Sequence, residues 1–243
     1  MKFGLIGDTL KHSFSKEYFE KKFLDLKMPH CSYHNFEFGS IEEFPALIKT
    51  HRDLRGINVT SPYKEEVIPY LDELGEMAEE IGAVNTIKVI NAHTTGYNTD
   101  AYGFQRAIRP LLNDHHTNAL VLGTGGAAEA VGYVLEKLGI EYHFVSREPE
   151  GGKTIGYDDV DEYLIADNLL IVNATPLGRF PDVKTFARMP YSALSEDHLL
   201  FDLVYNPAET EFLRKGREFG AQTVNGLDML HIQAERSWEI WME

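Results

Sequence analysis

Short apolar runs alternate with longer amphipathic stretches from one end of the chain to the other. Residues 2–7 (KFGLIG) and 118–123 (NALVLG) are typical of the apolar runs, and each has the length of a strand. Strands that alternate with helices at this spacing indicate βαβ units and a mainly parallel sheet, which places the chain in the α/β class. The pattern predicts strands over 2–7, 31–38, 55–60, 84–90, 118–123, 142–146, 169–174 and 199–204. It predicts helices over 15–26, 41–50, 101–112, 127–138 and 209–219.

The same pattern divides the chain into two halves. Residues 91–100 (NAHTTGYNTD) are polar and rich in turn residues, and they separate the first four predicted strands from a second series. We therefore expect one domain over residues 1–100 and a second over residues 101–226. The closing stretch, residues 227–243, is amphipathic and contains Trp238 and Trp241. Its apolar side chains need a surface to pack on, and we expect this stretch to form a helix that returns to the first domain.

Composition and charge limit the classes of function. The 243 residues are 43% hydrophobic and carry a net charge of −15. This charge disfavours nucleic acid and anionic membranes as partners, so we expect neither. Cys31 is the only cysteine, no apolar run reaches the length of a membrane span, and the first residues lack a signal-peptide pattern. These features predict a cytoplasmic protein, and no metal site is expected because no Cys/His cluster has metal-ligand spacing.

A glycine-rich turn joins a predicted strand to a predicted helix at residues 120–131 (LVLGTGGAAEAV). Gly123, Gly125 and Ala128 match the G-x-G-x-x-A pattern of dinucleotide-binding loops. Glycine allows the tight turn and the close backbone approach that a pyrophosphate on a helix N-terminus requires. The strand before the loop and the helix after it are the context in which this motif binds a nucleotide.

The next predicted strand bears on which dinucleotide binds. NAD-specific sites place Asp or Glu at its end to hold the ribose hydroxyls, whereas this strand ends in Ser146 and Arg147. An arginine suits the 2′-phosphate of NADP, because its planar guanidinium binds phosphate with two hydrogen bonds. Glu148 would repel the same phosphate, so NAD stays open as a second cofactor. A solvated arginine at a strand end is the alternative interpretation.

Polar residues gather at the predicted strand ends of the first half. Ser13 and Ser15 follow the first strand, Lys64 follows the third, and Asn85 and Asp100 flank the fourth. Small ligands usually bind at strand ends in α/β proteins. By position alone, however, the serines and Asp100 are also good helix caps, and Lys64 is an ordinary solvated lysine at a helix start.

Eight segments, taken in order, resemble the shikimate dehydrogenase family. They are HSFS (12–15), NVTSPYKEEV (58–67), GAVNTI (82–87), YNTDAYGF (97–104), GTGGAA (123–128), NATPLG (173–178), DLVYNP (202–207) and NGLDMLHIQA (225–234). The resemblance implies NADP-linked, reversible reduction of 3-dehydroshikimate to shikimate, in aromatic amino-acid biosynthesis. It also implies that the first domain binds the substrate and that the second is a Rossmann-like NADP-binding domain.

The resemblance further implies a role for individual residues. The catalytic pair would be Lys64 and Asp100. The substrate would contact Ser13, Ser15, Thr60, Asn85, Tyr205 and Gln233. The cofactor would contact Gly123, Gly125, Gly126, Ala127, Ser146, Arg147, Asn173, Thr175, Gly226 and Met229. One departure concerns the cofactor: the family commonly has Asn-Arg-Thr where this chain has residues 146–148 (SRE), which bears on the strength of NADP selection.

The chemistry of ketone reduction explains why a lysine and an aspartate would be needed. Hydride transfer builds negative charge on the ketone oxygen, and a proton must reach that oxygen. Lys64 could stabilise the charge and supply the proton, while Asp100 could hydrogen-bond the ammonium group or a substrate hydroxyl.

Two other functions stay open: an NAD-linked dehydrogenase of quinate, and a catalytically silent nucleotide-binding sensor. The sequence leaves the oligomeric state undetermined, with a homodimer among the possibilities.

Overall fold

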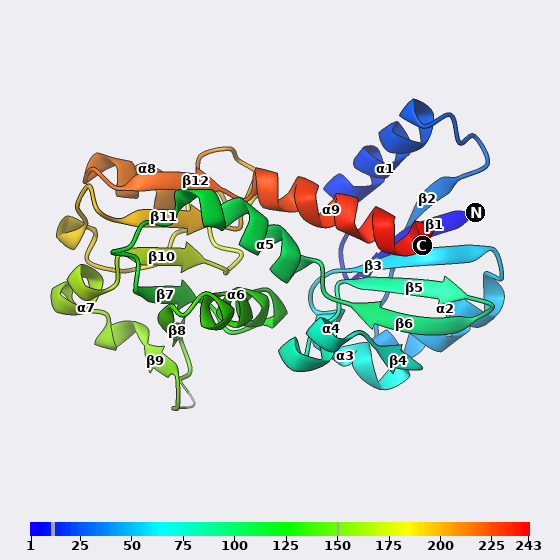
Figure 1. Cartoon of the computed structure of the whole chain (residues 1–243), viewed down its shortest axis with the longest axis horizontal. Coiled ribbons are helices and arrows are strands. Elements are labelled where there is room, and N and C mark those ends of the chain that lie inside the picture. The colour runs from blue at the N-terminus through cyan, green and yellow to red at the C-terminus, as the bar shows by residue number, and fades with distance from the viewer. Residues whose placement is uncertain (11–12, 150) are drawn as a thin grey trace. The chain divides into compact units, whose positions relative to one another are not determined.

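The computed structural model describes residues 1–10, 13–149 and 151–243, and its chain divides into two compact units (Figure 1). Unit 1 consists of Met1–Thr99 and Ala234–Glu243, and unit 2 consists of Asp100–Gln233. Each unit contains its own six-stranded sheet. Two units of alternating strands and helices confirm the predicted α/β class.

The sheet of unit 1 has the strand order β2-β1-β3-β5-β6-β4. Strand β1 runs parallel to β2 and β3, whereas β5 runs antiparallel to both β3 and β6. Its elements are β1 (Lys2–Gly7), α1 (Phe14–Asp25), β2 (Ser32–Glu37), α2 (Phe44–Thr50), β3 (Leu54–Val59), α3 (Tyr63–Glu66), β4 (Glu73–Leu74), α4 (Glu76–Ile81), β5 (Thr86–Ile90) and β6 (His93–Tyr97).

Strand β6 lies inside the segment that the sequence predicted to be a polar, turn-rich connection. It forms a hairpin with β5, and the turn between them is made by Asn91 and Ala92, which have positive φ angles of 53° and 68°. Thr94 in this strand is 2% exposed. The prediction was wrong for residues 93–97 because their threonines and tyrosine favour a strand once a paired neighbour is present.

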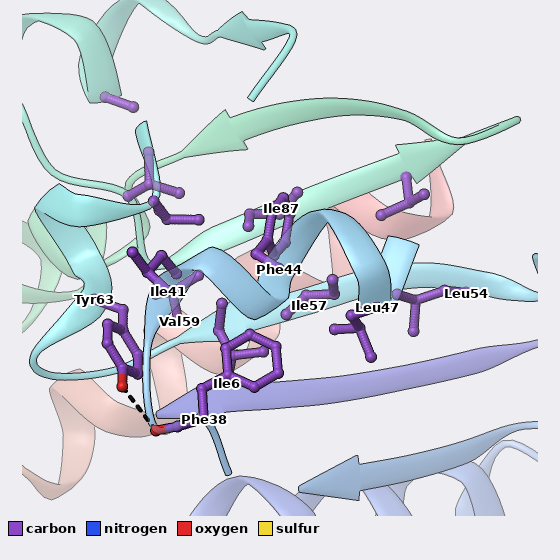
Figure 2. Close-up of a cluster of buried hydrophobic side chains, with 14 residues drawn as sticks. Ile6, Phe38, Ile41, Phe44, Leu47, Leu54, Ile57, Val59, Tyr63 and Ile87 are labelled. Carbon is purple, nitrogen blue, oxygen red and sulfur yellow. Dashed lines mark hydrogen bonds between the residues drawn. The ribbon is translucent and has the colours of Figure 1, made fainter. Parts of the chain in front are cut away.

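One face of the unit 1 sheet carries the hydrophobic cluster shown in Figure 2. Ile57 and Val59 of β3 point into this cluster at alternate positions, and Phe44 of α2 covers them. Tyr63, at the start of α3, is 4% exposed and donates a hydrogen bond of 2.7 Å from its hydroxyl to the carbonyl oxygen of Phe38. The chain that follows β3 is therefore anchored in the core.

The opposite face of this sheet carries an aromatic cluster that includes the last turns of helix α9 (Leu227–Met242). The ring of Trp241 packs against Phe3 and Phe19, and its Nε1 donates to the carbonyl oxygen of Ile87 at 3.0 Å. Gly56 makes room for this ring, because a Cβ at that position would lie 2.4 Å from it. The closing helix thus packs on the first sheet, as the sequence predicted.

The sheet of unit 2 has the order β12-β11-β10-β7-β8-β9, with all neighbours parallel. Strand order reverses between β7 and β10, as in doubly wound dinucleotide-binding folds. Besides the first turns of α9, its elements are α5 (Asp100–Ile108), β7 (Asn118–Leu122), α6 (Gly126–Lys137), β8 (Glu141–Ser146), β9 (Thr154–Gly156), α7 (Glu162–Asp167), β10 (Leu170–Asn173), β11 (Leu199–Asp202), α8 (Glu211–Glu218) and β12 (Gln222–Asn225). The edge strands β9 (TIG) and β12 (QTVN) escaped sequence prediction because they lack the continuous apolar run that marks the equally short but buried strands β10 and β11.

Candidate functional site

Unit 1 brings three residues of the predicted site, Thr60, Lys64 and Asn85, to one edge of its sheet. The carboxyl ends of β1 and β3 and the amino end of the antiparallel β5 meet there. The backbone N–H of Thr60 donates to the carbonyl oxygen of Ile6 at 3.0 Å, and Asn85 accepts at its carbonyl oxygen from Val59 at 2.8 Å. Thr60 and Asn85 therefore flank the end of β3.

Lys64 lies in the single-turn helix α3 at this same edge, and its side chain is half-buried. Its backbone carbonyl accepts a hydrogen bond of 2.7 Å from the N–H of Val84, the residue before Asn85. The buried ring of Tyr63 fixes the preceding position. Lys64 is thus held beside Asn85 by backbone bonds and by core packing.

The two predicted carboxylate-binding serines follow β1. Ser13 is the N-cap of α1, and its Oγ accepts from the N–H of Ser15 at 3.3 Å, so the capping interpretation is correct for this residue. Burial raises the pKa of the Tyr33 phenol, and the Ser15 side chain opposes that rise; the phenol itself donates to Asn58 Oδ1 at 2.8 Å. His12 of the HSFS motif lies outside the described residues.

A buried hydrogen-bond network, which the sequence did not predict, surrounds the Asn85 side chain. Its Oδ1 accepts from the backbone N–H of Thr99 at 2.7 Å and its Nδ2 donates to Thr99 Oγ1 at 3.0 Å. The hydroxyl of Ser237, which is fully buried, lies 2.7 Å from Thr86 Oγ1 and accepts from Asn58 Nδ2 at 3.1 Å. Polar residues inside apolar strand patterns, such as Asn58, are the signal that could have revealed this network.

Other predicted substrate-site residues belong to unit 2. Asp100 is the first residue of α5 and is 8% exposed, so its carboxylate lies where the helix dipole favours negative charge. Tyr205 is half-buried after β11, and Gln233 donates from Nε2 to the carbonyl oxygen of Leu230 at 3.0 Å. Because Lys64 and Asp100 belong to different units, their pairing stays a prediction.

The predicted glycine loop connects β7 to α6 in unit 2. Gly123 has a φ of +110°, and a Cβ there would lie 3.2 Å from Cγ2 of Thr175. Gly125 is the N-cap of α6 and forms no side-chain cap bond, while a Cβ on it would meet no atom within 4 Å. Gly126 and Ala127 begin the helix. An uncapped helix start with open space before it fits a phosphate group.

Ser146 and Arg147 follow at the carboxyl end of β8, the strand beside β7. The Ser146 Oγ donates to the carbonyl oxygen of Glu148 and accepts from its N–H, both at 3.2 Å. The side chains of Arg147 and Glu148 are exposed. Arg147 and Glu148 are thus consecutive exposed residues after β8, and the predicted contact of Arg147 with a 2′-phosphate stays a prediction.

Asn173 lies at the carboxyl end of β10, opposite Asp202 of β11 in the sheet register. Asn173 Nδ2 donates to Asp202 Oδ1 at 2.9 Å, and Asn173 Oδ1 accepts from Oγ1 of Thr175 at 2.6 Å. Thr210 donates to Asp202 Oδ2 at 2.5 Å. Burial raises the pKa of Asp202 to about 6, although these hydrogen bonds lower it. Asp202 and Thr210 had no predicted role; the aspartate inside the apolar run LLFDLV was the signal that could have revealed Asp202.

The last two predicted cofactor residues are buried near the end of β12. A Cβ on Gly226 would lie 2.3 Å from the carbonyl oxygen of Leu203, so only glycine fits there. Met229 is 6% exposed, and its carbonyl oxygen would lie 2.7 Å from a Cβ on Gly103. Both residues help to pack the first turns of α9 within unit 2.

Two negative findings concern the described parts of the chain alone. Within residues 1–10, 13–149 and 151–243, no group of three or more His, Cys, Asp or Glu side chains is arranged to hold a metal ion. No helix over those ranges has the length and apolar character that crossing a bilayer requires.

The reversed parallel sheet and the uncapped glycine loop define a protein of the dinucleotide-binding α/β class, with a second α/β unit.

Comparison with known proteins narrows this class to one family. The family model described as the shikimate dehydrogenase substrate binding domain matches residues 5–87. A shikimate dehydrogenase (NADP(+)) of Halothermothrix orenii is 36% identical, over 98% of this chain and 89% of that protein. The chain therefore belongs to the shikimate dehydrogenase family.

The solved structures that resemble the whole chain include two with a bound nucleotide. One is shikimate 5-dehydrogenase of Thermus thermophilus in complex with NADP(H) and shikimate, with a TM-score of 0.86, 31% identity and coverage of 99% of this chain and 93% of that one. The other is quinate dehydrogenase of Corynebacterium glutamicum in complex with NAD, with a TM-score of 0.87, 30% identity and the same coverage.

Proposed function

We propose that this chain catalyses the NADP-linked, reversible reduction of 3-dehydroshikimate to shikimate. The observation that carries the proposal is the uncapped glycine start of α6 at the reversal point of a parallel sheet, in a chain of the shikimate dehydrogenase family. Unit 2 would bind the nucleotide and unit 1 the substrate, which is a small molecule. A nucleic acid or a membrane surface is not part of the proposal, in line with the net charge of −15.

We assign the cofactor to residues that follow the strands of unit 2. The pyrophosphate would contact Gly123, Gly125, Gly126 and Ala127, where glycine leaves space and α6 begins uncapped. Ser146 and Arg147 would bind the 2′-phosphate. The residues proposed for the nicotinamide end are Asn173, Thr175, Gly226 and Met229. When bound, the oxidised cofactor accepts the hydride from shikimate.

We assign the substrate to hydroxyl and amide groups. The hydroxyls of Ser13 and Ser15 would donate to the substrate carboxylate. Thr60, Asn85 and Gln233 would bind its ring hydroxyls, and Tyr205 would lie close to it. The network around Asn85 supports this assignment, because it fixes the orientation of the amide before a ligand arrives.

Lys64 and Asp100 would handle the proton. During shikimate oxidation the reacting hydroxyl must lose its proton, and during the reverse reaction the ketone oxygen must gain one. The Lys64 amino group would take and return that proton, and its ammonium form would stabilise negative charge on the oxygen. The Asp100 carboxylate would accept a hydrogen bond from Lys64 or from a substrate hydroxyl and so orient it.

The proposed reaction fits a cytoplasmic location, which the single cysteine also favours.

The alternative, an NAD-linked dehydrogenase of quinate, is less favoured because the curated relatives that match over most of the chain carry the name shikimate dehydrogenase (NADP(+)). A homodimer is the assembly to test first, by sedimentation velocity.

The purified protein should reduce NADP when shikimate is added, which nicotinamide absorbance would follow. Four assays, pairing shikimate or quinate with NADP or NAD, separate the proposal from its alternative. The highest kcat/KM with shikimate and NADP is the expected result. Turnover of quinate with NAD alone would replace the proposed substrate and cofactor. Nucleotide binding without turnover of either substrate would favour a silent sensor.

A further inference from the structure

The buried carboxylate of Asp202 stands out among the acidic groups of unit 2. It is fully buried, and all its partners in the described chain are neutral donors. Its Oδ1 accepts from Asn173 Nδ2 at 2.9 Å and from the backbone N–H of Val204 at 3.0 Å, and its Oδ2 accepts from Thr210 at 2.5 Å. A carboxylate that gives up water for three neutral partners costs stability, so a reason for its presence is needed.

The Asp202 carboxylate dictates which way the Asn173 amide points. An ionised carboxylate can only accept, so the amide must turn Nδ2 toward Asp202. The opposite end of the amide faces the backbone N–H of Thr175 at 3.1 Å, which can only donate and therefore requires Oδ1. A flipped Asn173 would lose both bonds. With 1% of its surface exposed, Asn173 has its polar atoms committed to the protein.

This amide in turn holds the chain segment that borders the glycine loop. Asn173 Oδ1 accepts from both the N–H and the hydroxyl of Thr175, and Thr175 Oγ1 accepts from the N–H of Leu177 at 3.3 Å. The methyl group of Thr175 would lie 3.2 Å from a Cβ on Gly123. Residues 174–178, which we name the β10 turn, are therefore fixed directly beside the glycine loop.

We propose that Asp202 is a positioning residue of the cofactor site, which orients Asn173 and thereby holds the β10 turn against the glycine loop. The inference rests on the proposed function, and it changes the role of Asn173. Its side chain supports the turn rather than contacting the nicotinamide, which leaves the backbone and Thr175 as the groups of this turn that meet the cofactor.

The decisive variant is Asn173→Asp, which keeps the size of the side chain and replaces the donor by a second acceptor. Above neutral pH two carboxylates would face each other across 2.9 Å, and the Kd for NADP+ should rise at least about 10-fold relative to wild type. Near pH 5.5 the pair should share one proton, which restores a hydrogen bond and brings the ratio of Kd values to within about 3-fold. The 2′-phosphate of the cofactor titrates equally with both proteins, so dividing the variant Kd by the wild-type Kd at the same pH removes its contribution.

The other titratable groups around Asp202 should stay constant over this range. Tyr191 senses the charge of Asp202, but its pKa is raised mainly by burial, so it stays neutral. Glu211, next to Thr210, has its pKa lowered by the Arg214 guanidinium and stays ionised. Asp202 itself titrates near pH 6 in wild type, so Asp202→Asn, which cannot titrate there, is measured at both pH values as well. A pH rescue seen only in Asn173→Asp reports on the shared proton.

Asn168→Asp is the matched control. Asn168 precedes the opposite end of β10, is 3% exposed and donates from Nδ2 to Leu164 at 2.8 Å. The variant introduces the same chemical change at about 16 Å along the chain from Asn173, so it should lower stability and leave the Kd for NADP+ unchanged. Wild-type affinity of Asn173→Asp at pH 8, or an equal loss at both pH values, would overturn the proposal.

Two substitutions of Asp202 provide an independent test should Asn173→Asp fold poorly. Asp202→Asn retains an oxygen acceptor for Asn173 and Val204, and its Kd for NADP+ should stay within about 3-fold of wild type. Asp202→Leu removes the acceptor that Asn173, Val204 and Thr210 share. Asn173 Nδ2 then keeps only its longer bond of 3.4 Å to the carbonyl oxygen of Leu177, and binding should weaken at least about 10-fold. Equal affinities for the two variants would contradict a positioning role.

Hydrogen exchange of the Thr175 amide in the cofactor-free protein separates this inference from the proposed function. The amide should exchange faster in Asp202→Leu than in Asp202→Asn, whether or not NADP+ is the true ligand. If wild-type protein fails to bind NADP+, the proposed function falls, and this amide alone decides whether Asp202 orders the β10 turn. Equal exchange in both variants would reject that ordering.

Discussion

Lys64 owes its position to its neighbours. The buried Tyr63 ring anchors the residue before it, and Val84 N–H holds its carbonyl oxygen. A lysine on a solvated helix start would need neither. This local rigidity suits a group that must meet one substrate oxygen, because acid–base catalysis depends on hydrogen-bond geometry as well as on pKa.

Replacing Lys64 by alanine should lower kcat by roughly 10²- to 10⁴-fold, the usual range for an acid–base group. The Kd for NADP+ should not change, since the proposed nucleotide site lies in unit 2. Steady-state kinetics and direct NADP+ titration measure the two quantities. Lys49→Ala, at an exposed position of α2, serves as the control and should keep wild-type kcat. Near-normal turnover of the Lys64 variant would reject the catalytic assignment.

Asp202 makes a pH-dependent contribution to stability. Its pKa of about 6 in the folded chain lies above the unfolded value of 3.8, so the folded state binds the proton more tightly. Stability from this group is therefore present below pH 4 and is lost as pH rises through 6. The loss is about 3 kcal/mol over the whole range.

Asp202→Asn removes this titration. Between pH 5 and pH 8, the unfolding free energy of wild type should fall relative to that of Asp202→Asn, by an amount within that 3 kcal/mol. Urea unfolding at several pH values measures the difference. A difference that stays constant, or one that grows in favour of wild type, would show that Asp202 does not titrate in this way.

At the scale of elements, helix starts carry the candidate chemistry. Helix α6 begins with a glycine N-cap and no side-chain cap, whereas α1 begins with Ser13 as an ordinary cap. The helix start is thus open at α6, where a phosphate is expected. At α1 it carries a hydroxyl cap, whose O–H is proposed to donate to the substrate carboxylate. Helix α9 has a different task, because its last turns fill the aromatic face of the unit 1 sheet.

Trp241→Ala should destabilise unit 1 by about 3–5 kcal/mol, because it empties a large volume in the core and removes the bond to Ile87. Met242→Ala, at the next position of α9 with 45% exposure, should cost less than about 0.5 kcal/mol. Thermal or urea unfolding of the pair provides the comparison. Equal effects would mean that the end of α9 does not pack as described.

At the scale of the whole molecule, two sheets with separate cores share one chain. Residues 234–243 complete unit 1 although they follow all of unit 2 in sequence. Unit 1 therefore cannot be completed until the last residues are present. Each unit has its own proposed ligand, and ligands that bind only the folded state stabilise the unit they contact.

Amide hydrogen exchange should resolve the two ligands. NADP+ alone, at about 100 times its Kd, should stabilise its site by about 2.7 kcal/mol and slow exchange at residues 123–128 and 174–178. Shikimate alone should slow exchange at residues 60–66 and at Asn85. Protection by NADP+ at residues 60–66 with none at the glycine loop would reverse the proposed assignment of ligands to units.

Much of this protein is determined by patterns that are local in sequence. Alternation of apolar and polar stretches predicted both sheets and most helices, because burial of one face imposes a period on each element. The glycine loop was also predictable, since a turn that needs a φ of +110° at Gly123 restricts the residue type there. Strand β6 was missed, because its polar composition favours a strand only beside β5.

The tertiary structure alone decided which polar groups meet. Asn173 and Asp202 are 29 residues apart, and Thr86 and Ser237 are 151 apart, yet each pair forms a buried hydrogen bond. No local pattern encodes such a partner, because the bond depends on strand order and register. Asn173 and Asp202 appear in the sequence as polar residues within or at the end of apolar runs, whereas Ser237 follows the charged Glu235 and Arg236 and gives no such signal. Folding removes water from them, and that loss of water makes their partners and their pKa values matter.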